Sequence, residues 1–275
     1  MMDLTNEFGF MAIATFVAFR ALKNGETPVA CIFVHEPTNT ILSFGCNDTN
    51  RSLNGTMHAE FVAIEKIFQG FNLYKKGRGE IIDFFMEVTL YVTVEPCVMC
   101  ALAIKQLGIK RVYFGAANDR FGGNGTVIKV QENDSYSSCG GIMRVEAVQL
   151  LRNFYIQENN TAPVPKVKKN KEIDGKSFPP NLDFRKYLTE EMFDQIYGEV
   201  RREEFFRHPN PNREITPTIA KGYELLDLLS EEKILNIPNL SDLYPLHDMD
   251  VVKDIMELNL LLPRIEDDGI VKWRS

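Results

Sequence analysis

The sequence is poor in the features from which disulfide scaffolds and membrane anchors are built. Its 275 residues include only five cysteines. This number is small for a disulfide-rich fold, and because it is odd, the cysteines cannot all form pairs within the chain. The most apolar early stretch covers residues 8–19, which is shorter than the roughly 20 residues that cross a bilayer. Asp3 and Glu7 stand where a secretory signal would carry positive charge. We therefore expect an intracellular protein without a transmembrane helix.

An excess of basic residues is also missing, because 31 lysines and arginines face 38 aspartates and glutamates, for a net charge of −7. This balance argues against a protein that coats nucleic acid with its whole surface, but it leaves local basic patches open. Residues 1–171 contain 18 basic and 16 acidic residues, whereas residues 172–275 contain 13 and 22. Hydrophobic residues make up 44% of the chain, which excludes disorder throughout and predicts one or two folded domains.

The spacing of apolar residues predicts a layered α/β domain in the first 160 residues. We expect helices over residues 8–19, 57–68, 97–107 and 149–158, and strands over residues 29–34, 41–44, 89–94, 111–115 and 144–148. The first helix is predicted to be buried and amphipathic, because its apolar residues recur at helical spacing, namely Phe8, Met11, Ala12, Phe16 and Phe19. This order of elements predicts a five-stranded sheet covered by helices.

The composition changes after the predicted domain. Residues 161–171 contain two prolines, four lysines and no acidic residue, which predicts an exposed linker. We place this linker at residues 161–182, between a domain of residues 1–160 and an acidic extension of residues 183–275. Helical patterns over residues 187–206 and 219–235 predict a helical extension, to which the sequence assigns no role.

Two short segments hold a group of metal-binding side chains. His58-Ala-Glu60 supplies an imidazole, and Glu95-Pro-Cys97-Val-Met-Cys100 supplies two thiols. Three protein ligands leave the fourth position of a zinc ion open for water, which is typical of catalytic zinc sites. The three-residue spacing places both sulfurs on one face of a helix, whose N-terminal end favours thiolates. Glu60 is poorly placed as a ligand beside His58, but it is positioned to exchange protons with the zinc-bound water.

The pair of cysteines has other interpretations. A closed structural zinc site would need a fourth ligand, which Cys139 or His35 could supply. A thioredoxin-like redox pair would leave the His-x-Glu segment unexplained. We expect Cys31, Cys46 and Cys139 to be structural, because free cysteine commonly behaves as a small buried hydrophobe.

His58-x-Glu60 followed by Pro96-Cys97-x-x-Cys100 resembles the signature of the zinc nucleobase deaminases. Further segments resemble the TadA-like tRNA adenosine deaminases, namely Thr27-Pro28-Val29, Gly45-x-Asn47, Met99, Gly115-Ala-Ala-Asn118 and Phe121-Gly122-Gly123. Asn118 and the Phe-Gly-Gly segment are most similar to the catalytic subunit of the eukaryotic wobble-adenosine deaminase heterodimer. The resemblance covers about residues 8–160 and departs at Ala30, where many relatives have glycine.

This resemblance implies a three-layer cytidine-deaminase-like fold, with a five-stranded mixed sheet covered by helices and a C-terminal helical extension. It also implies that His58, Cys97 and Cys100 bind Zn²⁺, which lowers the pKa of its water. Glu60 would then move protons while hydroxide attacks C6 of adenine. The product would be inosine at the first anticodon position of tRNA.

The resemblance further implies how the substrate is bound. Asn47, Val29 and the backbone near Ala59 would bind a base that is extruded from the anticodon loop. A homologous, catalytically silent subunit would complete a heterodimer in the nucleus and cytoplasm, because one domain offers a small surface for a whole tRNA. A deaminase of free cytosine, deoxycytidylate or guanine would use the same zinc ligands and is the main alternative. A non-catalytic scaffold subunit is disfavoured by the acid at position 60.

Lys166, Lys168, Lys169 and Lys171 form the densest basic cluster of the chain. They are either part of a solvated linker or a site that binds tRNA phosphates. Because the first 171 residues carry nearly balanced charge, we expect affinity for a polyanion to depend on such a local cluster.

Overall fold

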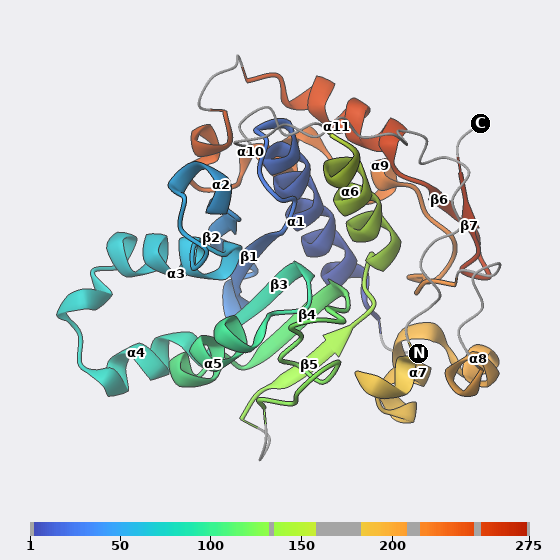
Figure 1. The fold of residues 1–275 in the computed structure, drawn as a ribbon, viewed down its shortest axis with the longest axis horizontal. Helices are drawn as coiled ribbons and strands as arrows, with labels where there is room; N and C mark the ends of the chain where they lie inside the picture. Colours follow the sequence, from blue (N-terminus) through green and yellow to red (C-terminus); the bar gives the residue numbers. More distant parts are fainter. Residues whose placement is uncertain (1–2, 132–134, 158–182, 208–214, 245–248, 274–275) are drawn as a thin grey trace.

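The computed structural model describes residues 3–131, 135–157, 183–207, 215–244 and 249–273, and a five-stranded sheet lies at its centre (Figure 1). The strands are β1 Ala30–His35, β2 Thr40–Cys46, β3 Val88–Val94, β4 Arg111–Ala116 and β5 Ser137–Gly140, in the spatial order β2-β1-β3-β4-β5. β1 runs antiparallel to β2 and β3, whereas β3, β4 and β5 are parallel. The expected five-stranded mixed sheet is therefore confirmed.

The direction of the strands determines which loops lie together at one edge of the sheet. β1 and β3 are apolar along nearly their whole length and buried on both faces, as strands between two helical layers must be. Because β3 and β4 are parallel, their carboxyl ends lie at the same edge of the sheet. Glu95, directly after β3, donates its backbone N–H to the Ala116 carbonyl at the end of β4, at 2.7 Å. The loops that follow these two strands therefore begin side by side.

Helices cover both faces of the sheet (Figure 1). The helices of the first 157 residues are α1 Thr5–Lys23, α2 Thr49–Ser52, α3 Ala59–Gly70, α4 Arg78–Phe85, α5 Val98–Leu107 and α6 Arg144–Ile156. α1 packs on β1 and β3 and α6 on β4, whereas α3 packs on β2 and β1 from the other side. Gly45 lets β2 approach α3 closely, because a Cβ there would lie 2.0 Å from the Ala59 carbonyl oxygen. This close approach fixes the start of α3 against the sheet.

The fifth strand is not where the sequence pattern placed it. Residues 144–148 were expected to form a strand, but they are the first turns of α6, and the fifth strand is β5, seven residues earlier in the chain. The residues from Arg144 to Val148 favoured a strand, yet they form a helix in which Arg144, Glu146 and Gln149 are all buried. β5 is short and contains serines and glycine, so it has no apolar pattern to detect. Cys139 lies in this strand and not in a turn.

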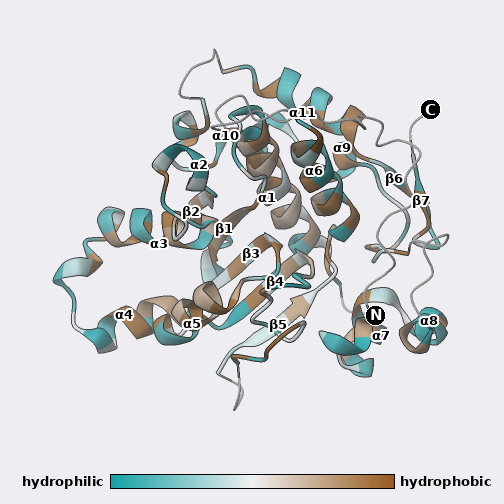
Figure 2. Cartoon of the chain, in the orientation of Figure 1, coloured by the Kyte–Doolittle hydropathy of each residue, from teal (hydrophilic) through white to brown (hydrophobic). Residues whose placement is uncertain are grey.

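α1 is buried all around and is not amphipathic as expected. Every residue from Met11 to Leu22 is buried, including Thr15 and Arg20. Its inner face contacts the sheet and α6, and its outer face contacts α9 and α11 of the C-terminal part. In Figure 2 the ribbon of α1 is largely apolar, whereas hydrophilic residues are frequent on α7 and α8. A helix that is apolar on all sides is typical of the centre of a larger core.

The part of the chain after residue 182 consists of short elements wrapped around one side of the domain (Figure 1). They are α7 Glu190–Tyr197, α8 Arg202–Phe206, α9 Leu225–Leu228, α10 Glu231–Leu235, α11 Val251–Leu261, and the antiparallel pair β6 Arg264–Ile265 and β7 Val271–Lys272. The expected helical extension is present, but its helices are shorter than the patterns suggested. Gly198, with φ of +87°, ends α7, and Ser230 caps α10 through the Lys233 N–H. None of the described helices combines the length and apolarity needed to span a bilayer.

Buried polar contacts attach these C-terminal elements to the domain. The Arg20 guanidinium on α1 donates to both carboxylate oxygens of Asp254 on α11, at 3.0 and 3.1 Å, and lies 4.0 Å from the centre of the Tyr244 ring. On α6, the Glu146 carboxylate accepts a hydrogen bond of 3.0 Å from the Tyr223 hydroxyl. Each contact joins residues more than 70 positions apart, so the C-terminal elements belong to the same packed core as α1.

Candidate active site

Local backbone geometry places the imidazole and the carboxylate at the start of α3. His58 is the N-cap residue, with extended backbone angles that turn the chain into the helix. Glu60 lies in the first helical turn and is only 3% exposed. The Asn47 side chain supports this turn, because its Oδ1 accepts the Ala59 N–H at 2.9 Å. The end of β2 therefore orients both functional residues.

The two thiols lie at the start of α5. Cys97 is the N-cap residue of this helix, and Cys100 lies on its buried face. Pro96 precedes the cap, and Gly108 ends the helix with φ of +79°. Both sulfurs are thus near the positive end of the helix dipole, which stabilises thiolates.

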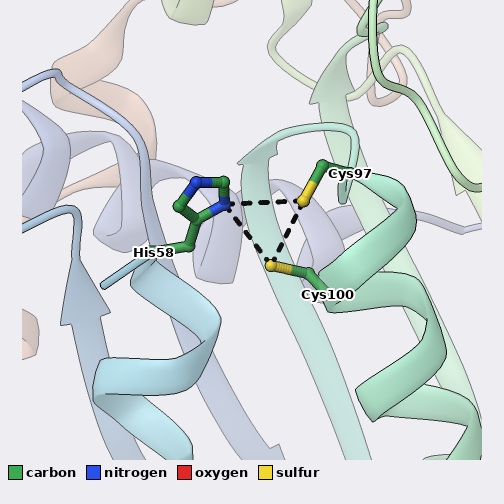
Figure 3. Close-up of side chains that lie close together, drawn as sticks. All are labelled: His58, Cys97 and Cys100. Carbon is green, nitrogen blue, oxygen red and sulfur yellow. Dashed lines mark hydrogen bonds between the residues drawn. The ribbon is translucent and has the colours of Figure 1, made fainter. Parts of the chain in front are cut away.

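The three ligand atoms form a nearly equilateral triangle (Figure 3). The Nδ1 atom of His58 is 3.5 Å from the Cys97 sulfur and 3.6 Å from the Cys100 sulfur, and the two sulfurs are 3.6 Å apart. Tetrahedral zinc with Zn–S of about 2.3 Å and Zn–N of about 2.0 Å separates its ligand atoms by roughly 3.5–3.8 Å. The imidazole and two thiols therefore fit a zinc ion that keeps one position for a further ligand.

Neither of the two other proposed zinc ligands joins this group. Within the described residues, the metal-binding group consists of His58, Cys97 and Cys100. His35 is hydrogen-bonded to Thr38 and Glu87, and Cys139 lies in β5. The described residues therefore do not form a structural zinc site with four protein ligands.

The electrostatics of the group favour metal binding by thiolate. The Cys100 thiol donates a hydrogen bond that, together with the imidazole of His58, lowers the pKa of Cys97 to about 4. The same hydrogen bond to Cys97, together with burial, raises the pKa of Cys100. Burial also raises the pKa of the Glu60 carboxyl. A carboxyl whose pKa is brought closer to neutrality is suited to accept and return protons.

A cavity of about 650 Å³ opens beside the metal-binding group. Its floor is formed by the metal-binding side, with His58, Glu60 and Cys97. The walls come from the ends of β1, β2 and β3, from the loop after β4, and from the last turns of α6; they include Thr27, Val29, Asn47, Val94, Glu95, Ala117, Asn118, Asp119, Arg120, Phe121, Leu151 and Tyr155. The side chains of His58, Glu60 and Cys97 thus face one space that is open to solvent.

The predicted substrate-binding residues have different positions. Val29 and Asn47 line the cavity, whereas Ala59 is buried and outside its lining. The Asn47 side chain also accepts a hydrogen bond from the Ala59 N–H. This residue therefore has a structural contact in addition to its place in the cavity lining. Lys166, Lys168, Lys169 and Lys171 lie outside the described residues.

Sequence reasoning missed the contribution of α6 and of Glu95. Leu151 and Tyr155 reach the cavity only because α6 packs on β4, and their spacing in the sequence contains no such signal. Glu95 could have been noticed, because an acid that directly follows an apolar strand and precedes Pro96-Cys97 is unusual at a buried position. It is 2% exposed and lines the cavity.

The fold and this ligand group define a zinc-dependent deaminase, and comparison with known proteins agrees. Residues 5–116 match the cytidine and deoxycytidylate deaminase zinc-binding region. The chain is 39% identical to tRNA-specific adenosine deaminase 2 of Xenopus laevis over 175 residues, covering 61% of this chain and 97% of that protein. It belongs to the tRNA-specific adenosine deaminase 2 family.

The chain is also similar to a longer relative and to a solved structure. The chain is 46% identical to the tRNA-specific adenosine deaminase subunit tad2 of Schizosaccharomyces pombe over 166 residues, which is 59% of this chain but only 40% of that longer protein. A solved structure from work on A-to-I editing by tRNA:A34 deaminases aligns with 52% of this chain and 98% of its own, at 25% identity and a TM-score of 0.43.

Proposed function

We propose that this protein converts the wobble adenosine of tRNA to inosine by zinc-dependent hydrolysis. The observation that carries the proposal is the cavity that joins a three-ligand zinc site to the buried carboxylate of Glu60. Membership of the tRNA-specific adenosine deaminase 2 family supports the choice of adenosine in tRNA over other amino-bearing bases.

The chain's own residues would divide the chemistry between metal binding and proton transfer. His58, Cys97 and Cys100 would hold zinc through one imidazole and two thiolates, and the bound metal would supply the Lewis acidity that makes water nucleophilic near neutral pH. Glu60 takes a proton from the attacking water and delivers it to N1 of adenine. It then takes the remaining proton from the hydroxyl group on C6 and passes it to the amine that leaves C6, so that water and adenosine give inosine and ammonia. A buried carboxyl with a raised pKa is suited to both transfers.

Exposed aromatic residues beside the cavity favour a nucleic-acid substrate over a free base. Phe121 is 65% exposed and Tyr155 is 62% exposed, and both line the cavity. Exposed rings of this kind stack on the bases of single-stranded nucleic acid. An anticodon loop offers neighbouring bases for such stacking, whereas a free nucleobase does not. Asn47 and Val29, which line the cavity, would contact the extruded base itself.

The remaining expectations concern the assembly and its location. We propose that the chain pairs with a homologous, catalytically silent subunit, and that the pair works in the cytoplasm and nucleus, where tRNA is processed. We also propose that Lys166, Lys168, Lys169 and Lys171 bind tRNA phosphates next to the catalytic domain. The family resemblance and the high density of positive charge in the sequence support these two proposals.

A substrate panel tests the proposed activity. The purified protein, alone and with any subunit that copurifies, is incubated with a tRNA that carries A34, with the same tRNA carrying G34, and with free adenosine and cytidine. We expect inosine only in the A34 tRNA, and no product with Glu60→Ala. Deamination of the free compounds without reaction on tRNA would instead identify a small-molecule deaminase.

A further inference from the structure

The buried carboxylate of Glu95 takes no part in the chemistry described above, yet it is strongly hydrogen-bonded. Its Oε2 accepts the backbone N–H of Asn118 at 2.9 Å. Its Oε1 accepts the backbone N–H groups of Asn124 and Thr126 at 2.9 and 3.2 Å. One side chain therefore binds three amides at both ends of a nine-residue segment, residues 118–126, which we name the wall loop.

The wall loop encloses this carboxylate closely. A Cβ at Gly122 would lie 2.4 Å from Oε2 of Glu95, so only glycine fits at that position. On either side of it, the Gly123 N–H donates to the Pro96 carbonyl at 2.8 Å, and the Phe121 carbonyl accepts the Val98 N–H at 3.0 Å. The inner side of the wall loop is thus attached to the segment that connects β3 with α5.

The outer side of the wall loop forms part of the cavity. Asn118, Asp119, Arg120 and Phe121 all line it, and Phe121 is largely exposed. The positions of the side chains that a substrate would meet therefore depend on the backbone conformation of the wall loop, which is held by its hydrogen bonds to Glu95. Beyond these residues, Asn124 anchors the loop to β5 through a hydrogen bond of 2.7 Å from its Nδ2 to the Ser138 hydroxyl.

We infer that Glu95 is a positioning residue for substrate binding, which holds the wall loop in the conformation that receives the nucleotides around the reacting base. The inference rests on the proposed function for the identity of the substrate, but not for the role of Glu95 in holding the loop. The carboxylate is needed because all three of its partners are donors. A glutamine of the same shape would bring its own N–H₂ group against at least one of them.

A second buried carboxylate, which is not part of the cavity lining, supplies a matched control. Glu26 is 6% exposed and accepts the backbone N–H groups of Asn50 and Arg51 at 3.1 and 2.6 Å. Those residues belong to the segment between Asn47 and His58, which both line the cavity. Glu26→Gln therefore makes the same chemical change at a similar depth, but acts on a different segment.

Hydrogen–deuterium exchange on the full chain tests the holding role directly. In Glu95→Gln we expect exchange in residues 118–126 to become about tenfold faster or more, as the removal of a hydrogen bond to a charged group predicts. Exchange in α5 and the zinc content should stay as in the wild type. Glu26→Gln should accelerate exchange around residues 50 and 51 instead. Unchanged exchange in the wall loop, or loss of zinc from Glu95→Gln, would overturn the inference.

Steady-state kinetics with the A34 tRNA tests the consequence for substrate. We expect Glu95→Gln to raise KM about tenfold while kcat stays within about threefold, and Glu95→Asp to lie between it and wild type. A lowered kcat at unchanged KM would show that Glu95 supports the chemical step and not substrate positioning. If wild-type protein does not deaminate tRNA at all, the proposed function fails, whereas the exchange result still decides whether Glu95 holds the loop.

Discussion

His58 and Cys97 share a feature that neither residue type would reveal alone, because each is the N-cap residue of a helix. Both side chains therefore project from a helix start into the same space, where the Nδ1 atom and the sulfur come within 3.5 Å. The positive ends of α3 and α5 face the ligands and stabilise the anionic sulfur. Residues 39 positions apart thus meet because two helices begin at one edge of the sheet.

The ligand triangle predicts about one tightly bound zinc ion per chain. Cys97→Ala and Cys100→Ala should each lose it, because two remaining ligands hold zinc weakly. Elemental analysis of the purified variants measures this directly. Cys46→Ala is the control, since that thiol lies outside the group and should keep full zinc. Stoichiometric zinc in both ligand variants would rule out the site.

Glu60→Gln is expected to retain the fold and the zinc but to lose turnover. General acid–base groups contribute about 10²–10⁴-fold, and this residue acts twice in one cycle. The measurement is inosine formation at saturating tRNA, with zinc content determined on the same sample. Glu80→Gln, at an exposed position of α4, should behave as wild type. Activity within a few-fold of wild type would assign proton transfer to another group.

Asn47 requires a pair of variants, because its side chain has a structural contact as well as a place in the cavity. Asn47→Asp keeps the oxygen that accepts the Ala59 N–H but removes the amide donor. We expect it to retain zinc. Its kcat/KM should fall by the equivalent of about 1–3 kcal/mol, which is the cost of one unpaired buried polar group. Asn47→Ala removes both and should in addition destabilise the start of α3. Kinetics and zinc analysis on both variants separate the two roles.

At the scale of elements, α1 shows how tertiary context overrides a local pattern. Its sequence places apolar residues at helical spacing, but Thr15 and Arg20 are buried along with them. The Thr15 hydroxyl donates to the Met11 carbonyl at 2.8 Å, and Arg20 is paired with Asp254. Polar groups are tolerated in this helix because each has a partner.

The ion pair of Arg20 with Asp254 should be a main attachment of α11 to the domain. Arg20→Ala removes the bidentate partner of a carboxylate that is 5% exposed and should cost about 3–5 kcal/mol of unfolding free energy. Urea denaturation measures this change. Arg51→Ala is the control, because Arg51 is 82% exposed in its pair with Asp48 and should cost less than about 1 kcal/mol. Equal stability of the two variants would contradict the attachment.

The start of α6 is the element that the local sequence pattern predicted wrongly. The sequence of residues 144–148 favoured a strand, although these residues begin α6 and the buried Glu146 accepts a hydrogen bond from the Tyr223 hydroxyl. The hydrogen-bond partner lies 77 positions away, in the C-terminal part. No local signal could have shown that this glutamate faces inward.

At the scale of the whole molecule, charge is distributed unevenly, and the basic cluster of residues 166–171 lies between a nearly neutral domain and an acidic C-terminal part. Changing Lys166, Lys168, Lys169 and Lys171 to alanine should weaken tRNA binding. It should also flatten the dependence of log affinity on log salt, by a little under one unit for each phosphate that is no longer neutralised. Binding at several salt concentrations measures the slope, and zinc content shows that the site is intact. An unchanged slope would assign tRNA binding to other surfaces.

The sequence by itself determined most strands of the sheet and the family, and it predicted His58, Cys97 and Cys100 as zinc ligands and Glu60 as the group that transfers protons. These features depend on residue type and on short spacings, which local structure preserves: a C-x-x-C pair shares a helix face wherever that helix lies. The tertiary structure alone decided the fifth strand, the burial of α1 over residues 11–22, the part that Leu151 and Tyr155 take in the cavity, and the hydrogen bonds that join Glu95 to the wall loop. Each of these depends on contacts between residues far apart in the chain, which become predictable only when the layers are packed together.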